Sequence, residues 1–240
     1  MTISASMVWG WIASNANSFN TALGKSDMTL EVMLTRSADL QAEILRLLED
    51  VPTHPGERFE ASMIACGVAL EHAQALRILF EHGNPTTAMS ALRLQFEALT
   101  RAMWMLYAAS DLAIQKLMAP LTEESARVAN KLPQVGEMIE AIVKKAPVGA
   151  SSMLIQFKDI SWSAMNSYVH SGIHPLRRHL EGYPTQLVLQ VLRNSNGLMT
   201  MTGMLAAILT GNDCCINPMR VIQTQFKDCL PPLNPLAPQV

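Results

Sequence analysis

The chain has 240 residues, of which 49% are apolar and 16% are charged, and its formal net charge is −2. Globular proteins average roughly 25% charged residues, so this chain has ample material for a core and little charge to solvate its surface. The small net charge excludes a chain-wide basic field for nucleic acid, and a surface this apolar is often covered by a partner subunit.

The four cysteines, Cys66, Cys214, Cys215 and Cys229, include no C-x-x-C pair. Two of them are adjacent, a spacing that rarely forms a disulfide without strain. We therefore expect free thiols in a reducing cytoplasm, with no disulfide framework, metal centre or cofactor.

The N-terminal stretch MTISASMVWGWIASN lacks the basic start and the continuous apolar segment of a secretory signal. We expect an N-terminal arm or helix over residues 1–27. The most apolar stretch further on, Gly197–Gly211, spans 15 residues, whereas crossing a bilayer takes roughly 20. It is predicted to be a buried core helix, and we expect the protein to have no membrane contact.

Apolar residues recur with the 3.6-residue period of an α-helix along most of the chain, and no convincing run alternates as a strand does. The first three predicted helices cover residues 28–50, 58–82 and 85–109. Between the last two, Gly83 favours the end of one helix and Pro85 the first turn of the next. A turn this short predicts an antiparallel hairpin.

Shorter helices are predicted in the middle of the chain, and two long ones nearer its C-terminus. The expected ranges are 110–118, 122–132, 133–146, 150–169, 176–182 and 184–211, the last with a bend at 194–197. The predicted fold class is all-α, an antiparallel multi-helix bundle in one domain over residues 1–240. We expect its core over residues 28–211, and a C-terminal helix and Pro-rich tail over 212–240.

The predicted helix over residues 85–109 carries a line of charge through an otherwise apolar sequence. Arg93, Glu97 and Arg101 recur every fourth residue, and at about 100° per residue they share one arc of the helix with Thr100 and Trp104. One interpretation is that this arc faces water, with Glu97 pairing with both arginines. The other is that it lines a polar cleft, where one positive charge is left over for an anion such as phosphate.

The segment WSAMNSYVHSGIHPLRRHLEG, residues 162–182, holds three of the six histidines and two adjacent arginines. Asn166 and His170 lie one turn apart on one helical face. His170 is close to the helix end, where an imidazole titrates near neutrality. Arg177 and Arg178, with the histidine after them, form the densest basic patch in the chain.

This segment allows three interpretations. The first is a capped helix end with arginines on the surface. The second makes His170 an acid or base, and His174, Arg177 and Arg178 substrate-binding residues. The third is a metal site of H-x3-H spacing at His170 and His174, but Gly172 and a following proline interrupt the continuous helix that such a site needs.

The stretches ALRLQFEALTRAMWMLYAAS and NSYVHSGIHP resemble a group of uncharacterised bacterial all-helical proteins with an R-x3-E helix and a V-H-x-G segment. The resemblance covers roughly residues 61–182. That group is in turn similar to HEPN domains, helical bundles that often dimerise and that include ribonucleases of toxin–antitoxin and phage-defence systems. The resemblance implies a HEPN-like fold, a homodimer and a function directed at RNA or a nucleotide.

The HEPN nuclease signature is an arginine followed, after four to six residues, by a histidine, usually with a polar residue just after the arginine. Asn166 and His170 fit the last two positions, but Met165 stands where the arginine belongs. We hypothesise that Arg93 or Arg101 replaces it in space, which requires the two helices to be neighbours.

If they are neighbours, the resemblance implies a metal-independent ribonuclease. His170 is then the acid or base that acts on the ribose 2′-hydroxyl, and Asn166 orients it or the substrate. Arg93 and Arg101 hold the phosphate, while Glu97 holds the arginines in place. The missing signature arginine leaves open a degenerate domain that binds RNA without cleaving it. The alternative is a non-catalytic interaction protein whose apolar faces form a homodimer.

Overall fold

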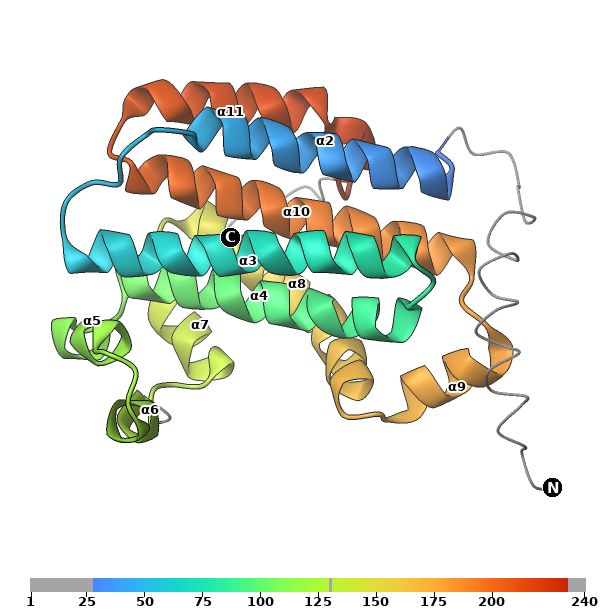
Figure 1. Cartoon of the computed structure of the whole chain (residues 1–240), viewed down its shortest axis with the longest axis horizontal. Helices are drawn as coiled ribbons and strands as arrows, with labels where there is room; N and C mark the ends of the chain where they lie inside the picture. Colours follow the sequence, from blue (N-terminus) through green and yellow to red (C-terminus); the bar gives the residue numbers. More distant parts are fainter. Residues whose placement is uncertain (1–27, 130, 233–240) are drawn as a thin grey trace, which may run out of the picture.

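One long helix lies at the centre of the molecule, and four other helices pack along it. The computed structural model describes residues 28–129 and 131–232, and in it the central helix is α10 (Thr185–Leu209). Figure 1 shows a helix pair on one side of α10 and a helical hairpin on the other. These four neighbours are α2 (Leu30–Leu48) and α11 (Asp213–Gln225), and α3 (Glu57–Glu81) and α4 (Pro85–Tyr107).

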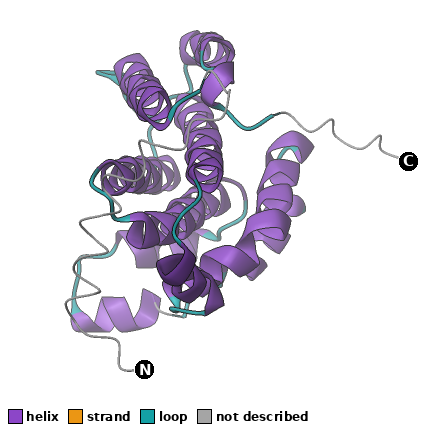
Figure 2. Cartoon of the chain, turned by 90° about the vertical axis from the view of Figure 1, so that its right-hand side faces the viewer, coloured by secondary structure: helices purple, strands orange, loops and turns teal. Residues whose placement is uncertain are grey.

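A second group of helices covers the outer side of the α3–α4 hairpin. Two of them, α7 (Val135–Val143) and α8 (Val148–Val169), pack against α4 and against each other. The remaining elements are short: α5 (Asp111–Met118), α6 (Glu123–Ala129), α9 (Ile173–Glu181) and the 3-10 turn η1 (Lys227–Cys229). Figure 2 shows helices in layers and no strand among the described residues, which confirms the predicted all-α class.

Glycine and proline set several helix boundaries, as predicted. Gly83 has a φ of 71° and follows the end of α3, while Pro85 opens α4. Ser110 caps α5, where its hydroxyl accepts a hydrogen bond from the Ala113 amide. Residues 194–197, where a bend was predicted, lie inside α10, which continues through them without a break.

The core extends further along the chain than residue 211, where we expected it to end. Met219, Phe226 and Cys229 are between 0% and 1% exposed, so α11 and η1 contribute to the same core as α10. The predicted N-terminal arm, residues 1–27, and the end of the Pro-rich tail, residues 233–240, lie outside the described residues.

Buried amide side chains tie α10 to its neighbours. Asn196 donates to Ser37 Oγ of α2 at 2.9 Å and to the carbonyl of Cys229 at 3.0 Å. Gln95 of α4 donates to the Ser195 carbonyl at 2.9 Å and accepts from the Ser195 hydroxyl at 2.7 Å. Because an unpaired buried polar group is costly, these contacts fix the registers of α2, α4 and the C-terminal turn against α10.

One helix in the described part of the chain, α3, is long and apolar enough to cross a membrane by length and composition. Core helices of soluble proteins pass the same test, and α3 packs along both α4 and α10. The apolar stretch Gly197–Gly211, predicted to be buried, covers the second half of α10 and the turn after it, and most of it is inside the bundle.

An ion pair fastens the C-terminal turn to α2. Arg36 binds Asp228 at two points, with Nε 3.0 Å from Oδ2 and Nη2 2.8 Å from Oδ1. The guanidinium carbon also lies 4.2 Å from the ring centroid of Phe226. The hydrogen bond from Arg36 lowers the pKa of the Asp228 carboxyl, and this effect outweighs the opposing effect of burial.

Replacing Asp228 with asparagine is expected to lower the free energy of unfolding by about 0.5–1 kcal/mol at pH 7, because the pair is partly exposed. A lowered pKa means that the carboxylate stabilises the folded state above the unfolded-state pKa of about 3.9. That contribution is lost as the pH falls through the still lower folded-state pKa. Urea denaturation should therefore give different free energies of unfolding for wild type and variant at pH 7, and equal ones at about pH 2. The same difference at both pH values would show that the effect does not come from the charge of Asp228.

Candidate functional site

The charged line of α4 faces two other helices and not open water. Residues of α7 and α8 face it across a cavity, and the side chains of Arg93 and Glu97 are 19% and 30% exposed. Thr100 and Trp104, which share the arc, are buried. Of the two interpretations of this arc, the structure therefore supports the polar cleft.

Arg93 makes three contacts at once in this cleft. Its Nε donates to Glu97 Oε1 at 2.6 Å, one turn further along α4. Its guanidinium carbon lies 4.8 Å from the ring centroid of Trp162 on α8, a cation–π contact. Its Nη1 lies 3.4 Å from Nε2 of His170, at the end of α8. The two predicted segments are thus neighbours, and one arginine joins them.

The contact with Arg93 fixes the tautomer of His170. A guanidinium has donors and no acceptor, so Nε2 of the imidazole must accept and the ring proton lies on Nδ1. The ring itself is exposed. His170 therefore presents an exposed ring to solvent, with its Nε2 directed at Arg93.

A tight turn holds His170 at the end of α8. Ser171 adopts a left-handed conformation with φ 52°, and the Gly172 amide donates to the Ser167 carbonyl at 2.7 Å, the pattern of a Schellman motif. Ser167 Oγ accepts from the His174 amide at 3.0 Å. A Cβ on Gly172 would lie 2.7 Å from Ser167 Oγ, so this position has little room for a side chain.

Replacing Ser171 with glycine is expected to raise the free energy of unfolding by about 0.5–1 kcal/mol, because glycine adopts positive φ without the steric cost of a Cβ. Urea denaturation measures the change. Ser163→Gly, at an exposed position inside α8, is the matched control and should destabilise by about the same amount. If Ser171→Gly lowered the free energy of unfolding as Ser163→Gly does, the left-handed conformation of Ser171 would be contradicted.

Asn166 lies one turn before His170, as predicted. Its Oδ1 is buried and accepts no hydrogen bond from the described residues. Such an orphan acceptor is a natural place for a water molecule or a ligand donor. Met165, in the place of the signature arginine, is 3% exposed and belongs to the core. The arginine that contacts His170 comes from α4 instead.

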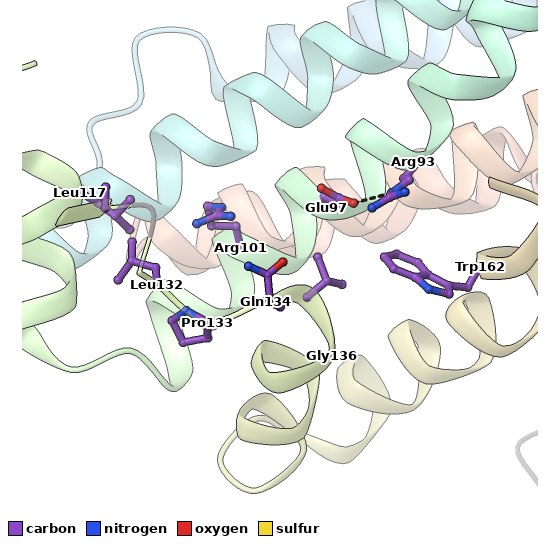
Figure 3. Close-up of a pocket in the computed structure, with 11 residues that line it drawn as sticks. Arg93, Glu97, Arg101, Leu117, Leu132, Pro133, Gln134, Gly136 and Trp162 are labelled. Atoms are coloured by element: carbon purple, nitrogen blue, oxygen red, sulfur yellow. Dashed lines mark hydrogen bonds and ion pairs between the residues drawn. The ribbon is translucent and has the colours of Figure 1, made fainter. Parts of the chain in front are cut away.

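A cavity of about 390 Å³ runs along the charged line, with Trp162 towards one end and Leu117 towards the other (Figure 3). Arg93, Glu97 and Arg101 all line it. Arg101 follows Arg93 by eight residues, roughly 12 Å along the helix, and forms no hydrogen bond with His170. The structure therefore brings Arg93, and not Arg101, to His170.

Three residues of this region had no local signal in the sequence. Trp162 and Gln134 line the cavity, from α8 and from the start of α7. Lys158 stands at its edge, since a Cβ on the cavity-lining Gly136 would lie 4.0 Å from Lys158 Nζ. Only the packing of α7 and α8 on α4 brings these residues to the charged line.

The basic patch of α9 lies outside the cavity. Arg177 and Arg178 both form ion pairs with Glu181, the second at 2.6 Å, so the three side chains together carry one positive charge. His174 is exposed, with its ring centroid 6.0 Å from that of Tyr168. The predicted role of these residues in substrate binding thus concerns a surface beside the turn at His170, not the cavity.

Two tyrosines next to α9 are neutral at physiological pH. Burial raises the pKa of Tyr168 to about 12, and it also raises the pKa of Tyr183. The Tyr183 hydroxyl lies 2.6 Å from Thr86 Oγ1, which joins the segment before α10 to the start of α4. Neither phenol is therefore a base near neutrality.

Comparison with known proteins gives one match. A family of unknown function, DUF6988, matches residues 66–232, which include α4, α7, α8 and α9 and every residue that lines the cavity. No curated protein and no solved structure matches the chain. The chemistry of the site therefore has to be inferred from its geometry.

Proposed function

We propose that this chain, which belongs to the family of unknown function DUF6988, binds RNA or a nucleotide through a phosphate at the Arg93–His170 end of the cleft. The observation that carries the proposal is the 3.4 Å contact between Arg93 Nη1 and His170 Nε2. It joins a cation and an imidazole from two helices at a surface-accessible position. That pairing suits a phosphodiester, whose charge the cation neutralises while the imidazole moves a proton.

The same contact suggests how cleavage proceeds. A phosphate oxygen that takes the Arg93 N–H also frees His170 Nε2. The imidazole then removes the proton of the ribose 2′-hydroxyl, and the 2′-oxygen attacks the phosphorus. The 5′-oxygen of the next nucleotide leaves and takes a proton from solvent, so the products are a 2′,3′-cyclic phosphate and a 5′-hydroxyl. Arg93 neutralises charge on the phosphate, and no metal takes part.

A HEPN-like fold is part of this proposal. The all-α bundle and the N-x3-H spacing at the end of α8 support it, as does an arginine beside the histidine. Arg93 would take the part of the arginine that Met165 replaces. A degenerate member that binds RNA in the cytoplasm without cutting it has the same architecture, and a ribonuclease would fit a stress or phage-defence setting.

RNA degradation and growth arrest by the full chain test the proposal, with His170→Ala and Arg93→Ala beside wild type. Loss of a general base costs about 100-fold or more in rate, so we expect both variants to lose cleavage and growth arrest. RNA binding without cleavage that Arg93→Ala abolishes would identify the degenerate form. A wild type that neither binds nor cleaves RNA at low salt would contradict the proposal.

His82→Ala is the matched control for His170→Ala. His82 is also exposed and also follows the last residue of its helix, α3. With Arg77 it forms a literal match to the arginine–histidine spacing of the nuclease signature, but eleven arginines and six histidines give about one such match by chance. We expect this variant to cleave RNA as wild type does. If His82→Ala lost cleavage and His170→Ala kept it, the catalytic histidine would be His82 on α3.

A second candidate function is homodimerisation through α9. Ile173, Leu176 and Leu180 are 69%, 66% and 73% exposed, and their spacing places them on one face of this short helix. Exposed apolar side chains gathered in this way are typical of contacts between proteins. We propose that a second copy of the chain covers them.

The molar mass in solution, measured by light scattering, tests the dimer. Leu176→Asp is expected to give a monomer, because it places a charge in the buried contact. Leu121→Asp, at a position 91% exposed and outside α9, should keep the wild-type mass. A monomeric wild type would contradict the dimer.

A further inference from the structure

Arg101 is a partly buried cation without an acidic partner in residues 28–129 and 131–232. It forms no hydrogen bond or ion pair there, whereas Arg93 in the same cavity is paired with Glu97. Figure 3 shows Arg101 towards the end of the cavity where Leu117 and Leu132 lie, away from Trp162. No acidic side chain among the described residues therefore neutralises the guanidinium at this end of the cavity.

The surroundings of Arg101 add further positive potential. The side chains lining the cavity include two cations, Arg93 and Arg101, and one anion, Glu97, so they carry one net positive charge. Lys158 adds a cation at the edge, beside Gly136. The first turn of α7 also lines the cavity, but Gln134 and Glu137 form a capping box there, so the amino end of this helix adds no free positive charge. An anion is therefore the ligand that balances this cavity.

The walls near Arg101 are mostly apolar, which limits the kind of anion. Leu117, Leu132, Pro133 and Val135 line the cavity together with Arg101. Its volume of about 390 Å³ falls in the range of about 300–1,000 Å³ found for small-molecule sites. An inorganic ion would leave these walls uncovered, whereas a ligand with an apolar body would cover them.

We propose that the Arg101 end of the cavity binds a small organic anion, with one carboxylate or phosphate head group at Arg101 and an apolar body against Leu117, Leu132 and Pro133. The guanidinium offers two parallel donors to either head group. This site is separate from the Arg93–His170 contact, since Arg101 lies roughly 12 Å further along α4. The inference does not depend on any action on RNA.

Calorimetric titration of the full chain with octanoate, octyl phosphate and 1-octanol tests the site. We expect one or both anions to bind, and the neutral alcohol to bind at least ten-fold more weakly, because it leaves Arg101 unpaired. The anion that binds more tightly identifies the head group.

Arg101→Met keeps the apolar stem and removes the charge, and it should weaken anion binding at least ten-fold. Arg101→Lys retains a cation and should keep binding within a few-fold, which separates a lost charge from a misfolded chain. Arg220→Met, at an exposed position on α11, is the matched control and should bind as wild type. Absence of binding by both anions, equal binding of 1-octanol, or undiminished binding by Arg101→Met would overturn the proposal. If one of these results were found and the protein still cleaved RNA, only the anion site would be excluded, and the proposed function at His170 would be unaffected.

Discussion

Phe96→Ala is expected to lower the free energy of unfolding by about 3–5 kcal/mol, the largest loss that we predict for one side chain. The Phe96 side chain is fully buried on α4. Its ring centroid lies 5.0 Å from that of Phe157 and 6.2 Å from that of Trp162, both on α8. The variant leaves a cavity under these two rings and removes two aromatic contacts, so the loss combines transfer free energy with lost packing.

Urea denaturation followed by far-ultraviolet circular dichroism measures this loss. Leu94→Ala is the matched control on the same helix, because its side chain is 44% exposed, and it should cost less than about 1 kcal/mol. A loss below about 1.5 kcal/mol for Phe96→Ala would contradict the packing of α8 on α4. Since Trp162 supports the Arg93 guanidinium, that result would also weaken the description of the cleft.

Asn196→Ala is expected to cost about 2–4 kcal/mol, the second largest effect. The side-chain amide of Asn196 donates to Ser37 Oγ and to the Cys229 carbonyl, and the residue is 1% exposed. Alanine leaves both acceptors without this donor, in a place that water does not reach. The cost should therefore exceed that of an ordinary surface hydrogen bond.

Asn194→Ala is the control for this variant. Asn194 lies on the same helix, and its side chain accepts from Gln190 at the surface, where water can replace the bond. We expect a change within about 1 kcal/mol. Equal losses for the two asparagines would mean that the tie between α10, α2 and the C-terminal turn contributes little to stability.

The helices were predictable because their signals are local. Gly83 and Pro85 mark the turn of the α3–α4 hairpin, and the apolar period identifies the long helices. The polar arc of α4 was also visible, since it depends on helix geometry alone. The contact of Arg93 with His170 could be stated as a hypothesis, and the structure places these side chains together.

What escaped prediction depends on contacts between distant segments. Trp162 and Gln134 reach the cavity only because α7 and α8 pack at one particular register on α4, which no local period encodes. The contribution of α11 to the core has the same origin. By contrast, the pairing of Arg177 with Glu181 was open to prediction, because a spacing of four residues places the two side chains on one face of a helix.

The position of α10 at the centre of the bundle has a consequence for synthesis. The α3–α4 hairpin is complete at Tyr107, but the helix that covers it ends at Leu209, about 100 residues later. At roughly 5–20 residues per second, the ribosome needs about 5–20 s to make that stretch. During this interval the apolar face of the nascent hairpin is uncovered. Faster elongation or chaperone binding should therefore reduce the fraction of newly made protein that aggregates.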